Sequence, residues 1–215
     1  MTLPETTDTT AQPDQPAGKL ARTRHKLVQA VHDEIAATGD FSAQRVALRA
    51  GTSTPTFYNH FATKDDALAA AYEQMMQGVV TLARRKCQIE RLLEIGLPAL
   101  VAEWVLMTGT FFHEHAALSR LAQAAMSRSK VMRDLFRDHE AEAIEVYRRF
   151  IELGQAAQAI RPGDAQAMAS VLTITAQSWH HQRVQNITPQ DPLHQDLSRM
   201  IVHLLQPGDD QSPTT

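Results

Sequence analysis

This 215-residue chain has one cysteine, few glycines and no long hydrophobic run. The single cysteine, Cys87, excludes an intrachain disulfide and is typical of a protein of the reducing cytoplasm. Apolar residues make up 43% of the chain, which is enough for a sizeable core, yet no apolar run is long enough to span a membrane. Residues 1–5 lack the basic and apolar regions of a secretory signal, so we expect a cytoplasmic protein.

The motifs of common enzyme classes are also missing. The sequence contains no nucleophile elbow, no phosphate-cradling glycine loop and no pattern that joins Cys87 to a histidine. Nine glycines in a helical pattern leave little room for an active site built on strand-end loops. We therefore expect no catalytic residue and no cofactor.

The net charge of −3 argues against a protein that coats nucleic acid indiscriminately. Basic residues nevertheless gather at the start of the first expected helix: Lys19, Arg22, Arg24, His25 and Lys26. Such a cluster is either a solvated helix face or a phosphate clamp.

The region 42–61 has the pattern of two short helices separated by a turn. Ser42 suits the start of the first helix, and Gly51 suits the turn after it. Phe57 and Phe61 are four residues apart, so both fall on one side of the second helix, which we expect to start at a Thr54 cap before Pro55. A helix, a glycine-containing turn and a second helix form the helix-turn-helix unit. The pair Thr63 and Asp66 then predicts the start of another helix.

Residues from about 20 to 72 resemble the DNA-binding domain of the tetracycline-repressor (TetR) family of bacterial regulators. The resemblance is carried by Gly39, Phe41, Val46-Ala47, Gly51, the run Pro55-Thr56-Phe57-Tyr58-Asn59-His60-Phe61 and Thr63-Lys64. Glu34 departs from the family pattern, because an apolar residue usually occupies that turn of the first helix.

The resemblance implies that helix 54–61 enters the major groove of double-stranded DNA. Base edges would be contacted by Gln44, Thr54, Pro55 and Asn59. Phosphates would be held by Thr56, Tyr58, His60 and Lys64, and we include Arg45 in the same surface. For Tyr58 and His60 the alternative is packing against the first helix.

The sequence predicts an all-α chain with an N-terminal three-helix DNA-binding domain and a C-terminal helical domain for ligand binding and dimerisation. The expected divisions are a disordered tail (1–18), the DNA-binding domain (19–72), the second domain (73–207) and a polar tail (208–215). The fourth helix is expected to run unbroken to about Arg85. Further helices are expected at 87–107, with a kink or break at Pro98, and at 110–125, 129–155, 164–185 and 191–206.

A small-molecule effector, largely apolar, is expected in the second domain, because ligand sites are mostly apolar with a few placed polar groups. The candidate residues are Trp104, Met107, Phe111, Phe112, His113, Phe136 and Tyr147. No metal site is expected, since His113 and His115 point to different faces of a helix.

A homodimer is expected, because one short reading helix contacts too few base pairs to select a site in a genome. The candidate interface is formed by Met168, Leu172, Ala176, Trp179, Arg183, Leu197, Ile201 and Leu204. The alternative is that these apolar stripes pack inside the subunit. The predicted function is a repressor that binds a palindromic operator and is released by a small molecule. Its rival is a ligand-binding helical protein whose N-terminal domain recruits a protein partner.

Overall fold

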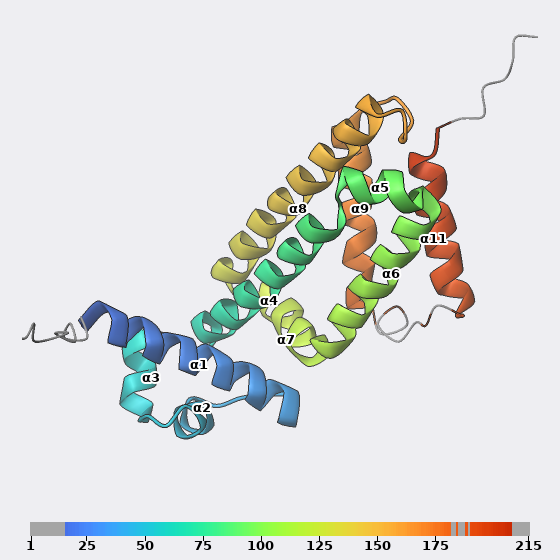
Figure 1. The fold of residues 1–215 in the computed structure, drawn as a ribbon. Helices are drawn as coiled ribbons and strands as arrows, with labels where there is room; N and C mark the ends of the chain where they lie inside the picture. Colours follow the sequence, from blue (N-terminus) through green and yellow to red (C-terminus); the bar gives the residue numbers. More distant parts are fainter. Residues whose placement is uncertain (1–15, 182–183, 185–187, 189, 208–215) are drawn as a thin grey trace, which may run out of the picture.

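The computed structural model describes residues 16–181, 184, 188 and 190–207, and all its regular elements in that part of the chain are helices (Figure 1). Four helices form the N-terminal part: α1 (Pro16–Thr38), α2 (Ala43–Arg49), α3 (Thr54–His60) and the start of α4 (Lys64–Lys86). The rest comprises α5 (Ile89–Ile95), α6 (Leu97–Glu114), α7 (Ala116–Met126), α8 (Lys130–Ala156), α9 (Ala165–Gln177), the 3-10 turn η1 (Ser178–His180) and α11 (Pro192–Leu205). The all-α prediction is confirmed. The predicted tails at 1–15 and 208–215 lie outside the described residues, whereas 16–18 already belong to α1.

The caps around α2 and α3 follow from the local sequence. The Ser42 hydroxyl accepts a hydrogen bond from the backbone N–H of Arg45 and so starts α2. Gly51 has φ 66°, the left-handed conformation that the turn between α2 and α3 requires. The cap of α3 is Ser53, one residue before the predicted Thr54, and its side chain accepts from the N–H of Thr56.

Helix α4 starts with the predicted capping box, in which Thr63 and Asp66 each accept a hydrogen bond from the other's backbone N–H. It then continues without a break to Lys86, as expected. Figure 1 shows that this one helix leads from the α1–α3 group into the larger helical bundle. Along its length α4 packs on α1, α6, α7 and α8.

The predicted helix 87–107 is two helices, and the expected break is confirmed. Gly96, at φ 78°, separates α5 from α6, and Pro98 lies in the first turn of α6, where its missing N–H costs no hydrogen bond. The predicted start of a new helix at 110 is wrong, because α6 continues to Glu114. The predicted helix 164–185 ends early, at Gln177, and is followed by the 3-10 turn.

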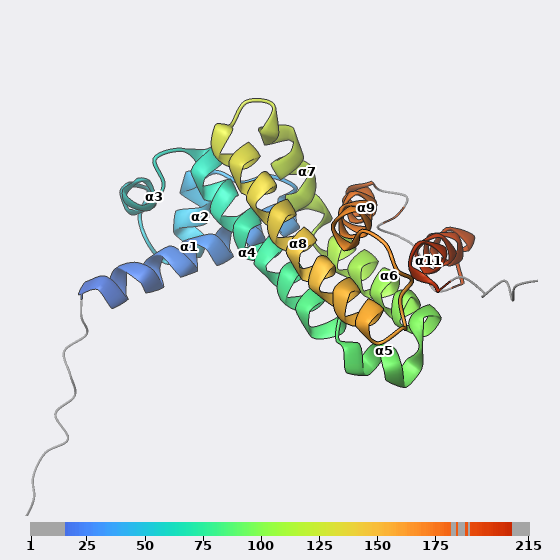
Figure 2. The ribbon, with the colours of Figure 1, turned by 90° about the horizontal axis from the view of Figure 1, so that it is seen from above.

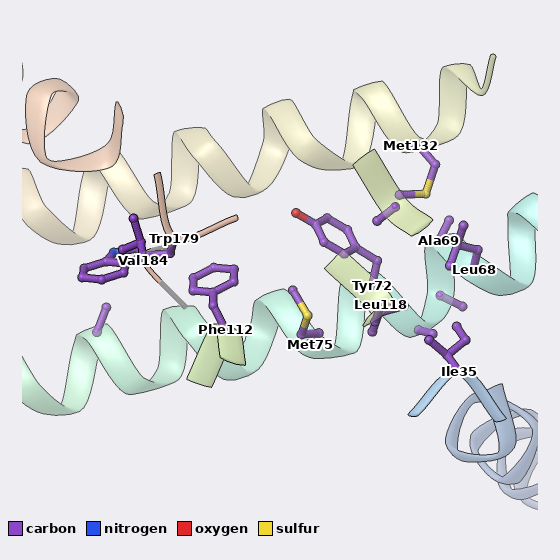
Figure 3. Packing of buried hydrophobic residues seen from close by; sticks show 14 of the residues in the cluster. Ile35, Leu68, Ala69, Tyr72, Met75, Phe112, Leu118, Met132, Trp179 and Val184 are labelled. Carbon is purple, nitrogen blue, oxygen red and sulfur yellow. The ribbon is translucent and has the colours of Figure 1, made fainter. Parts of the chain in front are cut away.

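The core of the larger bundle lies between α4, α6, α8 and α9. Figure 3 shows Tyr72, Met75 and Phe112 in the layer between α4 and α8, with Trp179 beside Phe112. Trp179 is fully buried and meets Trp104 edge-on at 6.2 Å between ring centroids.

This packing corrects part of the predicted dimer interface. Met168, Leu172, Trp179 and Ile201 are buried within the single chain, because their faces of α9, η1 and α11 pack on the bundle. Ala176, Leu197 and Leu204 are only partly buried, and Arg183 lies outside the described residues. Figure 2 shows α11 at the edge of the bundle, where it packs on α6 and α9.

The outward faces of α9 and α11 carry a different set of apolar side chains. On α9, Val171 and Ile174 are exposed to 45% and 62%. On α11 Met200 is half exposed, and Leu193, Leu197 and Leu204, at helical spacing from it, are partly buried against the core. These faces remain available for contact with another molecule.

Candidate DNA-binding surface and effector cavity

Helix α3 is held in place by two aromatic side chains. Phe57 is fully buried and Phe61 is 2% exposed, with their rings 5.4 Å apart. They hold α3 against the core and leave the opposite side outward. Pro55, Tyr58 and Asn59 are exposed there.

The other predicted contact residues lie around this helix. Thr54, Thr56 and His60 on α3 are partly exposed, and Gln44 and Arg45 are exposed on α2. Tyr58 is 55% exposed and touches Phe57 edge-on, so its hydroxyl end is not taken up by packing on α1. The structure thus brings the predicted residues of α2 and α3 to the surface of one helix-turn-helix.

Glu34 is the departure in the sequence pattern, and the structure gives it a role. Its side chain is 7% exposed and accepts hydrogen bonds from Arg45 and Arg49, each at 2.8 Å. The bonds from Arg49 and Arg45 hold the pKa of the Glu34 carboxyl below its usual value, against the opposing effect of burial. The carboxylate therefore ties α2 to α1 at two points.

Arg45 is shared between this ion pair and the surface. It donates from Nε to Glu34 and from Nη2 to the carbonyl oxygen of Asp40, at 3.2 Å, yet its side chain stays 48% exposed. A guanidinium has five N–H donors, so donors remain for a phosphate.

Lys64 stands at the first residue of α4 and is half exposed. Its ammonium contacts the Asp40 carboxylate at 2.8 Å and lies 4.7 Å from the centre of the Phe41 ring. The hydrogen bond from Lys64 holds the pKa of Asp40 below its usual value. Both partners are exposed, so this pair contributes little to stability and can open when a phosphate competes.

A cavity lies in the larger bundle between α4, α6, α8 and α9. The space between the atoms there is about 490 Å³, part of which is open to solvent. The lining residues are Met76, Val79, Thr108, Phe112, Phe136, His139, Glu140, Ala143, Tyr147, Thr173, Ala176 and Gln177. We call this space the central cavity.

The polar groups of the central cavity are few. The Glu140 carboxylate accepts a hydrogen bond from the Gln177 side-chain amide at 2.7 Å, which joins α8 to α9. His139 is 7% exposed, and neither ring nitrogen has a hydrogen-bond partner within the described residues. The nearest acid is Glu142, whose Oε2 lies 3.7 Å from Nδ1. A buried, unsatisfied imidazole of this kind requires an explanation.

The predicted effector residues divide into three groups. Phe112, Phe136 and Tyr147 line the central cavity. Trp104, Met107 and Phe111 line a smaller adjoining space of about 220 Å³, which Tyr147 also borders. His113 is exposed and belongs to neither lining, so its prediction as the polar group is not supported by its position.

Sequence reasoning missed the polar residues His139, Glu140 and Gln177. The adjacent pair His139-Glu140 was the available signal, since it places a histidine and an acid beside the aromatic positions of α8. Tyr147 borders both the central cavity and the smaller adjoining space. Burial raises the pKa of its phenol far above the usual range, and a hydrogen bond to Trp104 acts in the opposite direction.

A further cavity of about 380 Å³ opens near Cys87 and is bordered by α6, α8, α9 and α11. Burial raises the pKa of the Cys87 thiol to about 12, which removes the thiolate that a reactive cysteine needs. The part of the chain that the structure describes contains no cluster of three or more His, Cys, Asp or Glu side chains that could hold a metal ion. Within the same residues, no single helix is long and apolar enough to cross a membrane. Helices α5 and α6 are long and apolar enough only when taken together, and they are bent by 117° relative to each other.

Comparison with known proteins identifies the N-terminal region. Residues 37–71 match the family model of bacterial regulatory proteins of the tetR family. No curated protein matches the chain.

The fold is shared with solved structures at low sequence identity. A TetR transcription regulator from Haloarcula marismortui ATCC 43049 is 17% identical with TM-score 0.69, covering 86% of this chain and 100% of its own. The SmeT–triclosan complex is 18% identical with TM-score 0.61, covering 90% and 99%. A protein from Saccharomonospora viridis classed as a transcriptional regulator, in complex with choline, is 20% identical with TM-score 0.63, covering 87% and 100%.

Proposed function

We propose that this chain, a TetR-family regulator by its helix-turn-helix domain and its fold, is a dimeric repressor that binds a palindromic operator and is released by a small molecule. The observation that carries the proposal is the outward polar face of α3, held rigid by Phe57 and Phe61. The proposed division remains a DNA-binding domain at 19–72 and an effector and dimerisation domain at 73–207.

In this proposal α3 lies in the major groove, where base edges present distinguishable donors, acceptors and methyl groups. Gln44 and Asn59 carry the amides that suit purine edges, and exposed Pro55 offers apolar contact to a thymine methyl. Lys64 and Arg45, which both contact Asp40, meet phosphates beside this surface, which positions α3 without reading sequence.

The dimer is proposed to form through the outward faces of α9 and α11. Val171, Ile174 and Met200 are exposed there, and the small residue Ala167 lies on the same face of α9 one turn before Val171. Exposed apolar side chains at helical spacing on two neighbouring helices suit a four-helix interface between two copies.

Release is proposed to act through α4. The helix carries Ala71, whose backbone contacts His32 of α1, and Met76 and Val79, which line the central cavity, so one element borders both sites. Solved relatives in complex with triclosan and with choline support small-molecule binding. A ligand changes DNA affinity only to the extent that it binds one dimer geometry more tightly than the other.

The decisive test is selection of binding sites from random duplex DNA. The parent chain is expected to select an inverted repeat, and Gln44→Ala or Asn59→Ala should lose preference at one or two positions in each half-site. Each lost bidentate contact costs about 1–3 kcal/mol of discrimination. Gln77→Ala is the matched control, because it removes the same amide from an exposed position of α4 away from α3.

The control should select the parent motif. If no motif emerges from the parent chain, or if both test variants select the parent motif unchanged, the proposed reading surface is refuted.

A further inference from the structure

The central cavity has an unusual balance of charge. Among the described residues that line it, Glu140 is the only acid and none is Lys or Arg. An anionic ligand would therefore meet a carboxylate with no compensating cation, which is unfavourable in an apolar site.

A hydrogen bond orients the Glu140 carboxylate, but no positively charged side chain among the described residues pairs with it. Its hydrogen-bond partner is the uncharged amide of Gln177, and among the described residues no Lys or Arg forms an ion pair with it. An amide satisfies part of the carboxylate's hydrogen-bonding capacity and leaves its charge in place.

Aromatic faces surround the same space. Phe112 from α6 and Phe136 and Tyr147 from α8 line the central cavity together with Glu140. The face of an aromatic ring is negative and attracts a cation within about 6 Å, most strongly where water is excluded. A carboxylate and several rings around one apolar space form a site for positive charge.

His139 adds an independent sign that something binds here. It lines the cavity, is more than nine-tenths buried, and leaves both ring nitrogens unpaired within the described residues. A neutral imidazole has one acceptor nitrogen, which a ligand N–H or O–H would satisfy.

From these contacts we infer that the effector of the central cavity is an organic cation, a protonated amine with an apolar body. The positive head lies near Glu140 and the aromatic rings, and the apolar body lies along Met76, Val79 and Ala143. The inference rests on the proposed function, since it names the ligand class of the proposed effector site.

Three probes with one apolar body test the charge preference: 4-phenylbutylamine, which is protonated at neutral pH, 4-phenylbutanol and 4-phenylbutanoate. Their dissociation constants for the intact chain are measured by calorimetry without DNA. The cation is expected to bind at least about tenfold more tightly than the alcohol, and the anion most weakly. Equal binding of all probes, or a preference for the anion, would overturn the inference.

Two variants test which residues produce the preference for the cation over the alcohol. Glu140→Gln keeps an acceptor for Gln177 but removes the charge, so the preference for the cation over the alcohol should fall to about twofold or less. Phe136→Leu keeps an apolar side chain but removes a ring face, and it should weaken the cation more than the alcohol. Glu145→Gln is the control, because Glu145 is a half-exposed acid of α8 that does not line the cavity. An unchanged preference in both test variants, with folding intact by circular dichroism, would place the cation elsewhere.

Operator binding is measured separately so that the two proposals can fail independently. If the chain selects an inverted repeat but binds no cation, the ligand class is wrong and the regulator stands. If the cation binds with the predicted preference but does not lower operator affinity, the site is right and release by this ligand is wrong.

Discussion

Replacement of Ile174 by glutamate tests the proposed dimer interface most directly. Ile174 is 62% exposed on the outward face of α9, so the monomer gains little from it. Complete burial of an isoleucine is worth about 1.5–3 kcal/mol, so burying the exposed part in a dimer contributes about 1–2 kcal/mol for each protomer. Two-fold symmetry doubles this to about 2–4 kcal/mol per dimer.

The expected result for Ile174→Glu is a rise of the dimer dissociation constant by about 30-fold to several hundred-fold, at the rate of about 1.4 kcal/mol for each tenfold change. The introduced carboxylate adds to this cost if it is buried without a partner. The assay is sedimentation equilibrium over a concentration series, with helical content followed by circular dichroism.

Leu93→Glu is the matched control. Leu93 is 61% exposed, nearly the same as Ile174, but it belongs to α5, which packs on α6 and α8. The control should dimerise as the parent does. If Leu93→Glu dissociates the dimer and Ile174→Glu does not, the interface lies at the α5 end of the bundle and the reasoning is refuted.

Trp179→Glu should behave differently from Ile174→Glu, although both residues belong to the C-terminal apolar pattern. Trp179 is fully buried against Trp104, so its loss creates a cavity and buries a charge. The expected cost is about 3–5 kcal/mol or more of unfolding free energy. A folded, stable Trp179→Glu monomer would show that the indole faces a partner and not the core.

Three further predictions concern the DNA-binding region. Lys64→Ala should weaken binding to all sequences similarly and reduce the salt dependence by about one unit of slope, measured by fluorescence anisotropy; an unchanged slope would remove Lys64 from the interface. Glu34→Gln should lower the ratio of operator to random-DNA affinity, because Arg45 is freed to meet phosphate while α2 loses its tie to α1; an unchanged ratio would make the pair purely structural. Burial and the neighbouring His115 lower the pKa of His32, while a hydrogen bond to the Ala71 backbone and the charge of Asp33 oppose them. The free energy of unfolding should therefore fall as pH drops below about 6.5, and chemical denaturation of His32→Asn should show a smaller fall.

The helix-turn-helix could be predicted because its signals are local. Phe57 and Phe61 lie one turn apart, and the Thr63–Asp66 box needs only three residues of separation. The error at Ser53 and Thr54 arose because adjacent hydroxyl residues can both cap a helix. Local signals therefore define the elements to within a residue.

The tie at Glu34 could not be predicted in the same way. The sequence marks Glu34 as unusual, but its partners Arg45 and Arg49 are eleven and fifteen residues away. Their approach depends on how α2 crosses α1, which no pattern within one helix specifies. Without its partners, an acid at an expected apolar position indicates poor packing. With them, the buried Glu34 carboxylate forms ion pairs that join two helices.

The C-terminal helices show the limit of periodicity. Helix α11 has an inner set, His194, Ile201 and Leu205, and an outer stripe that includes Leu197 and Met200. Both sets repeat at helical spacing, so the sequence cannot tell which one faces the bundle. The prediction mixed residues of the two faces into one interface for this reason.

The two proposed sites are coupled through α4, because they lie only a few residues apart along this helix. Ala71, whose backbone contacts His32 of α1, and Met76, at the central cavity, are five residues apart, which is about 7.5 Å along the helix. A ligand that displaces the cavity wall therefore acts on the helix that supports α1 without an intervening loop. To move the dimer from almost fully bound to almost fully released, it must bind the released geometry about 10⁴-fold more tightly. Two copies share this requirement, so each cavity has to supply only about a hundredfold difference. That difference is within the range of a cation that meets Glu140 and the aromatic rings in one geometry and loses them in the other.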